Sequence, residues 1–137
     1  MVHYIVASHG ALASGFKSAL RVLLGTVKNV DFIDCYVDEK NPKELIRSAV
    51  EAVDEDTTLV MFSDLYGGSV CQIMNEFMNR PKTYQVAGIN LSLLIELLAQ
   101  NKDDITLDEL KICVDSMKDS LQCVVLDDAS DNETDFF

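Results

Sequence analysis

Two apolar runs of this sequence each end in a side chain that can take part in phosphoryl chemistry. His9 follows the first run, and Asp64 follows the second and precedes a short loop with Gly67, Gly68 and Ser69. A neutral imidazole attacks phosphorus through one ring nitrogen, and a carboxylate hydrogen-bonded to the other nitrogen stabilises the developing charge. The loop offers backbone amides and a hydroxyl to phosphate oxygens. These residue types together indicate phosphoryl transfer on a histidine.

The elements that must bring these residues together are the strands of a parallel sheet. Short apolar runs alternate with stretches of helical periodicity, which is the pattern of βαβ units. We expect strands at about 2–7, 30–37, 58–63 and 83–87. In a doubly wound α/β fold, ligands bind outside the carboxyl ends of the strands. His9 and Asp64 would meet at that edge if the first and third strands are neighbours, which the usual strand order permits.

Local signals predict where the helices begin and which faces they bury. Asn41 followed by proline is typical of a helix start, and Ser69 can cap the helix that follows the two glycines. Thr106 with Glu109 forms a capping box. Helical spacing predicts the core residues Phe16, Leu20, Leu23 and Leu24 in the first helix, and Leu91, Leu94, Ile95 and Leu98 in the fourth.

The chain has the pattern of one domain over residues 1–126, followed by an acidic tail over 127–137. Its 137 residues match the commonest domain size, and 48% hydrophobic residues suffice for a core. The tail has no Lys or Arg, so we expect it to be solvated and disordered. The apolar run 121–126 predicts a fifth strand, which either completes the sheet at an edge or pairs with another protomer. Because unpaired edge strands favour association, a homodimer is a reasonable hypothesis.

The composition argues against several classes of protein. A formal net charge of −12 disfavours binding to nucleic acid, since phosphate backbones require a positive surface. The four cysteines, at positions 35, 71, 113 and 123, form no CxxC pair, which argues against a zinc site and a disulfide framework. Free thiols, and a chain without a signal peptide or membrane span, predict a reducing cytoplasm. No metal and no cofactor is expected.

Each candidate residue also has a purely structural interpretation. Asp64 could cap the turn after its strand, the glycines could be needed for positive φ, and Ser69 could be only a helix cap. A single histidine is weak evidence for function, as His3 illustrates, because it lies at the start of a strand and has no partner nearby in sequence. We expect the core to be filled in part by Met61, Met74 and Met78. It is the joint placement at strand ends that favours function.

Three segments carry a family resemblance. Residues 5–10, 62–69 and 86–90 resemble the IIA domain of the mannose family of the bacterial sugar phosphotransferase system, with the same order and similar spacing. The resemblance covers about residues 1–125. It departs from the family at Val70, where proline is common. It implies a doubly wound, mostly parallel sheet of four strands, with 121–126 as an antiparallel strand exchanged between the subunits of a homodimer.

The resemblance also implies a function. His9 would accept a phosphoryl group from the phosphocarrier HPr and pass it to a IIB component during sugar uptake. Asp64 would hydrogen-bond the histidine, and Ser69 would lie beside the phosphoryl group. The protein would be a cytoplasmic, free-standing phosphotransferase component that contacts the membrane only indirectly, through the transporter. The sugar itself is not encoded in this domain.

The sequence is also compatible with three other functional interpretations. A receiver-type signalling domain would take phosphate on Asp64, but such a site needs clustered acidic residues after the first strand to hold magnesium. The phosphotransfer subunit of a dihydroxyacetone kinase has a similar fold and its histidine at the same position. A non-catalytic interaction domain would use the strand-end residues only structurally.

Overall fold

The computed structural model describes residues 1–126 as alternating strands and helices, and the predicted acidic tail lies outside these residues. The strands are β1 (Val2–His9), β2 (Val30–Cys35), β3 (Thr58–Ser63) and β4 (Thr83–Ala87). The helices are α1 (Leu12–Leu24), α2 (Pro42–Glu51), α3 (Ser69–Asn75), α4 (Leu91–Gln100) and α5 (Leu107–Met117), followed by a 3-10 turn, η1 (Lys118–Ser120).

The four strands form one parallel sheet in the order β2-β1-β3-β4. The expected positions of the strands and the pairing of the first with the third are therefore confirmed. The second strand ends at Cys35 rather than at 37, because Tyr36 has φ +65° and breaks the extended conformation. The strand order reverses at β1, so the crevice between β1 and β3 is the topological switch point of the fold.

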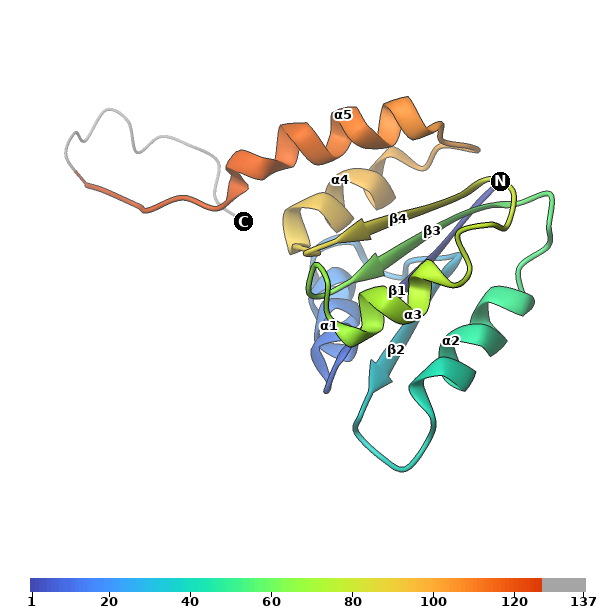
Figure 1. Ribbon diagram of the computed structural model, residues 1–137. Coiled ribbons are helices and arrows are strands. Elements are labelled where there is room, and N and C mark those ends of the chain that lie inside the picture. The colour runs from blue at the N-terminus through green and yellow to red at the C-terminus, as the bar shows by residue number, and fades with distance from the viewer. Residues whose placement is uncertain (127–137) are drawn as a thin grey trace.

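Helices cover both faces of the sheet (Figure 1). On one face α1 and α4 cover the sheet and α5 packs against α4, around a core that includes Val6 and Leu20. On the other face α2 and α3 pack through a core that includes Ile5 and Met74. Every residue of β3 is buried, as a central strand covered on both faces requires. The fold is a doubly wound α/β sheet, as the sequence predicts.

Helix starts follow the local signals in most cases. The Asn41 side chain accepts a hydrogen bond from the Lys43 amide, with proline at the first helical position. Both hydrogen bonds of the capping box of Thr106 and Glu109 are present. Ser69 is the exception, because the residue before α3 is Gly68 and no side chain caps this helix. The prediction of Ser69 as a helix cap was therefore wrong.

Two predicted core faces are only partly correct. In α4 the buried residues are Leu93, Leu94 and Leu97, whereas Leu91, Ile95 and Leu98 are only partly buried. This helix is apolar almost all round, so spacing alone does not determine which side faces the sheet. At the end of α1 Leu23 and Leu24 are about one-third exposed, since no element covers the last turn completely. Of the methionines expected in the core, Met78 is exposed.

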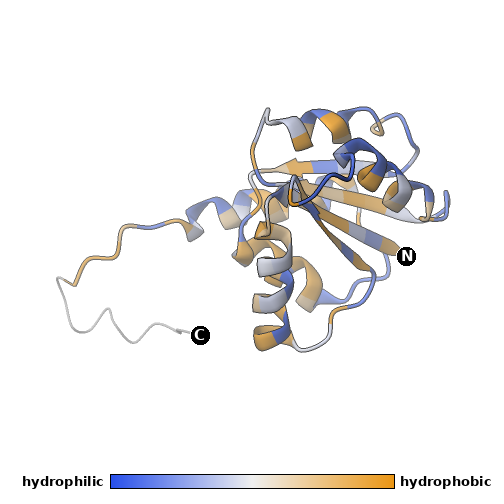
Figure 2. Cartoon of the chain, turned by 90° about the horizontal axis from the view of Figure 1, so that it is seen from below, coloured by the Kyte–Doolittle hydropathy of each residue, from blue (hydrophilic) through white to orange (hydrophobic). Residues whose placement is uncertain are grey.

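The run 121–126 does not form a strand within the described chain. It leaves the body of the protein after η1 in an extended path (Figure 1). Much of this path has the orange colour of hydrophobic residues in Figure 2, and Leu121 is 90% exposed and Leu126 81% exposed. Over residues 1–126 the sheet therefore has four strands, with β2 and β4 as its edges.

We expect the packing of α1 against the sheet to dominate local stability. Leu20→Ala should lower the free energy of unfolding by about 2–5 kcal/mol, because it removes a fully buried side chain and leaves a cavity. Val22→Ala in the same helix is the matched control, since Val22 is 82% exposed and should change the value by no more than about 0.5 kcal/mol. Urea denaturation followed by circular dichroism measures both. Equal effects of the two substitutions would contradict the packing described here.

Candidate active site

The carboxyl edge of the sheet brings His9 and Asp64 into direct contact. His9 is the last residue of β1, and Asp64 comes directly after β3, the strand beside it. The Asp64 carboxylate accepts a hydrogen bond from the His9 backbone N–H at 2.8 Å. The same oxygen, Oδ2, lies 2.9 Å from the ring nitrogen Nδ1, and Oδ1 lies 3.2 Å from it. The carboxylate thus holds both the backbone and the ring of His9.

The side chain of Asp64 is largely covered, with only 7% of it exposed. Burial by itself raises the pKa of this carboxyl group, but the hydrogen bonds from the His9 backbone and ring and the charge of His9 outweigh it, so the pKa is lowered. Asp64 is therefore a carboxylate at neutral pH and can only accept hydrogen bonds. Nδ1 is therefore the donor in this contact, and when the ring is neutral its lone pair lies on Nε2.

Nε2 faces outward and has one partner. The Ser69 hydroxyl lies 3.1 Å from it, and the His9 side chain is 40% exposed. Ser69 is the first residue of α3, and its hydroxyl is directed to the histidine rather than to a backbone amide of its own helix. An accessible, nucleophilic ring nitrogen beside a hydroxyl is an arrangement that can accept a phosphoryl group.

The glycine pair lets the loop approach the histidine. Gly67 has φ +78°, a conformation that L side chains rarely adopt. A Cβ on Gly68 would lie 3.1 Å from the Leu65 Cβ and 3.6 Å from the His9 Cε1. The Gly68 N–H donates to the Leu65 carbonyl at 3.1 Å and so closes the turn. Glycine is therefore favoured at 67 by the backbone conformation and at 68 by the close Leu65 side chain, and the Gly68 amide already has a partner.

Tyr36 is a residue of this site that sequence reasoning missed. Its ring stacks on the His9 ring with centroids 5.3 Å apart and planes at 25°. Its hydroxyl lies 2.9 Å from the Ser69 Oγ. The left-handed backbone at Tyr36 costs about 1–2 kcal/mol. The second strand expected from the sequence, 30–37, contains Tyr36, whereas in the structure this residue follows β2 directly, at the same sheet edge as His9 and Asp64.

His3 has a different environment. Its Nε2 lies 2.8 Å from the Asp31 Oδ2 on the neighbouring strand β2. This partner was not visible from the sequence, because it comes from an element 28 residues away. His3 lies near the start of β1, at the end of the sheet opposite to His9. It takes no part in the cluster around His9.

The cysteines agree with the expectation of free, mostly buried thiols. Cys35, Cys71 and Cys113 are buried and Cys123 is exposed, and all four are free. Burial, together with the charges of Asp64 and Asp34, raises the pKa of Cys35 to about 11. Although Cys35 pairs with His9 across the sheet, it remains a neutral thiol and is a poor nucleophile at neutral pH.

Neither metal ligation nor membrane insertion is indicated over residues 1–126. Within this range, no group of three or more His, Cys, Asp and Glu side chains lies together as metal ligands would. No helix in the same range is both long enough and apolar enough to cross a membrane.

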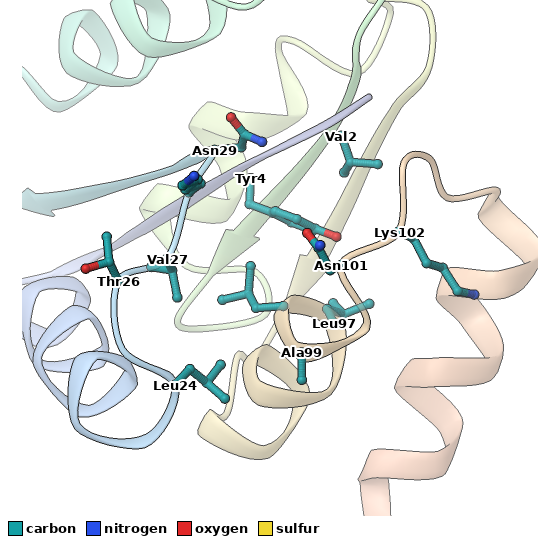
Figure 3. A pocket seen from close by; sticks show the side chains of 12 residues that line it. Val2, Tyr4, Leu24, Thr26, Val27, Asn29, Leu97, Ala99, Asn101 and Lys102 are labelled. Carbon is teal, nitrogen blue, oxygen red and sulfur yellow. The ribbon is translucent and has the colours of Figure 1, made fainter.

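A cavity lies away from the histidine cluster. It has a volume of about 550 Å³ and opens at the amino end of the sheet, between the start of β1 and the end of α4. The Tyr4 ring extends toward Asn101 in this cavity, with Leu97 and Val27 nearby (Figure 3). Burial raises the pKa of Tyr4. None of the residues around His9 lines this space.

Comparison of sequences identifies related proteins. The family model EIIA-man, PTS system fructose IIA component, matches residues 3–114. The mannose-specific EIIAB component of the PTS system of Escherichia coli K12 is 29% identical over 110 residues, which covers 77% of this chain and 34% of that protein. The chain thus spans about a third of the length of the relatives it matches.

Solved structures share the fold. A protein from Klebsiella pneumoniae, assigned as a phosphoenolpyruvate-dependent sugar phosphotransferase system permease, has a TM-score of 0.83 at 28% identity, covering 89% of this chain and 90% of its own. The mannose/sorbose-specific IIA subunit of Enterococcus faecalis has a TM-score of 0.76 at 18% identity, covering 92% and 96%, a likeness of fold alone. With most of its length matched by the family model, the chain belongs to the EIIA-man family, the IIA components of the mannose, fructose and sorbose class of the phosphotransferase system.

Proposed function

We propose that this protein is a cytoplasmic phosphocarrier in which His9 Nε2 accepts a phosphoryl group from phosphorylated HPr and passes it to a IIB component. One observation carries the proposal. A buried carboxylate engages Nδ1 at 2.9 Å, which leaves the lone pair on the accessible Nε2. The family supports HPr and IIB as the classes of partner. The transported sugar would be handled by other components.

The proposed transfer needs no cofactor. The Nε2 lone pair of His9 forms a bond to phosphorus while the bond from phosphorus to the donor's imidazole nitrogen breaks, and its electron pair returns to that nitrogen. Positive charge develops on the His9 ring, and the Asp64 carboxylate stabilises it through the hydrogen bond from Nδ1. Transfer to IIB is the same step with His9 as the leaving group.

We also propose that Ser69 and the loop with Gly67 and Gly68 bind the phosphoryl oxygens. The Ser69 hydroxyl lies 3.1 Å from the atom that would carry the phosphoryl group, which is the main support for its role. The Gly68 amide would have to release the Leu65 carbonyl before it could donate to an oxygen of the phosphoryl group. Ser69 is therefore the stronger candidate within the loop.

The acceptor is tested by removing each histidine in turn. His9→Ala should abolish the uptake of ³²P from phosphorylated HPr, because it removes the only proposed nucleophile. His3→Ala is the matched control, since His3 pairs with a carboxylate at the other end of β1, and it should be labelled like the unsubstituted protein. The label should be lost in acid and retained in alkali, as expected for phosphohistidine.

Three results would count against this assignment. Labelling that persists in His9→Ala would mean that another residue is the acceptor. Loss of the label in hydroxylamine would point to an acyl phosphate on Asp64, as in a receiver domain. Absence of any label from the unsubstituted protein would favour an interaction domain.

The carboxylate is tested by Asp64→Asn. A hydrogen bond to a charged group contributes about 1.5–3 kcal/mol, so its loss from the transition state should slow transfer about 10- to 150-fold without removing the acceptor. Rapid-quench measurement of ³²P transfer from HPr gives the rate. Asp31→Asn is the control, because Asp31 also contacts a histidine but lies outside the cluster. Transfer by Asp64→Asn at the unsubstituted rate would show that the carboxylate is not coupled to the ring.

We propose that the IIA domain comprises residues 1–126, with an acidic tail over 127–137, and that 121–126 forms an antiparallel strand on a partner subunit. The segment carries apolar side chains that are exposed, which is unfavourable in water. The outer edge of β4 has no strand beside it among the described residues and could accept one. Exchange of this segment would bury it and give a homodimer.

The proposed exchange is tested by truncation. Removal of residues 121–137 should convert a dimer into a monomer, because the pairing strand is lost. Removal of residues 127–137 alone is the matched control and should leave the dimer intact. Sedimentation equilibrium of the two truncated proteins and the full chain gives the masses. A full chain that is monomeric, or a dimer that survives the longer truncation, would refute the exchange.

A further inference from the structure

Tyr36 contacts both the proposed acceptor, His9, and the neighbouring Ser69, and the transfer step above does not use it. The ring stacks on the His9 imidazole at a centroid distance of 5.3 Å. The hydroxyl lies 2.9 Å from Ser69 Oγ, which itself lies 3.1 Å from His9 Nε2. Tyr36 is half exposed and is presented by a positive-φ turn directly after β2. Backbone conformations of this kind are concentrated at functional sites.

The hydrogen bonds that link Asp64, His9, Ser69 and Tyr36 form a series, and the Asp64 carboxylate sets the direction of each one. Asp64 can only accept, so in the neutral ring of His9 Nδ1 donates and Nε2 is left as an acceptor. Ser69 must then donate its proton to Nε2, and its oxygen is free to accept. The Tyr36 hydroxyl is the group that donates to this oxygen. In the unphosphorylated protein the hydroxyl proton of Tyr36 is therefore directed toward Ser69 Oγ, the atom next to Nε2 of His9.

Phosphorylation of His9 would remove Nε2 as a hydrogen-bond acceptor from this series. Once the Nε2 lone pair forms the bond to phosphorus, Ser69 can no longer donate to it. The phosphoryl oxygens would lie where the hydroxyls of Ser69 and Tyr36 now meet. We propose that Tyr36 is a phosphoryl-binding residue, whose hydroxyl donates directly to an oxygen of the phosphoryl group on His9. This inference rests on the proposed function of His9.

The change of the hydrogen-bond acceptor of Tyr36 favours the phosphorylated state of His9. In the unloaded protein Tyr36 donates to a neutral oxygen, whereas in the loaded protein it donates to an anionic one. Hydrogen bonds to ionised acceptors are roughly twice as strong as those between neutral groups. The hydroxyl of Tyr36 therefore shifts the transfer equilibrium toward phosphorylated His9, and the stacked ring shields one face of the imidazole.

The test compares Tyr36→Phe with Tyr66→Phe. Tyr36→Phe keeps the stacked ring and removes only the donor, and it should lower the equilibrium constant for transfer from phosphorylated HPr about three- to tenfold. Tyr66→Phe is the matched control, since Tyr66 is in the neighbouring loop, is 90% exposed, and should behave like the unsubstituted protein. In ³¹P NMR titrations, the pKa of the phosphoryl group should be higher in Tyr36→Phe, because a donor to the dianion is lost.

Two further measurements separate direct contact from an effect through Ser69. In a Ser69→Ala background, Tyr36→Phe should still lower the equilibrium constant; an effect that vanishes there would overturn direct contact. In the unsubstituted protein with ¹³C-labelled tyrosine, the Cζ resonance of Tyr36 should shift on phosphorylation while that of Tyr66 does not. An unchanged Tyr36 resonance would also overturn the inference. Failure of the unsubstituted protein to accept phosphate would instead refute the proposed function.

Discussion

The contact between the Asp64 carboxylate and His9 is the interaction on which the rest of the site depends. One buried carboxylate accepts from the backbone and faces the ring of the same residue, at 2.8 and 2.9 Å. This pairing fixes the orientation of the imidazole and the nitrogen that carries the proton. The same contact determines which nitrogen faces Ser69 and, through Ser69, how Tyr36 is oriented. Without the ionised carboxylate, the directions of these hydrogen bonds would no longer be set.

The strand order explains why these groups meet. With β1 between β2 and β3, the residues after three neighbouring parallel strands converge at one edge of the sheet. His9 comes from β1, Asp64 follows β3 and Tyr36 follows β2. The crevice between β1 and β3 is a topological switch point, where helices leave the sheet in opposite directions and expose the strand ends. Helices bury both faces of the sheet, whereas at this edge the His9 side chain is 40% exposed.

Much of the fold could be predicted from local patterns, and the failures have physical reasons. The strand at Thr58–Ser63 and the capping box of Thr106 depend on residues close in sequence, and both agree with expectation. The buried face of α4 was mispredicted because leucines on several sides of that helix leave its rotation to packing. Ser69 was mispredicted as a helix cap because its hydroxyl contacts the ring of His9, which is 60 residues away in the sequence. The run 121–126 has the composition of a strand but no partner within the described chain.

The sequence by itself determined which residues stand at the strand ends and where the chain turns, because apolar periodicity and capping are properties of neighbouring residues. It also marked His9 and Asp64 as a candidate pair. Only the tertiary structure decided that the two touch, that Asp64 is buried enough to act as a fixed acceptor, and that Tyr36 covers the ring. These features depend on strand order and on a left-handed turn, and both arise from contacts between residues that are distant in the chain.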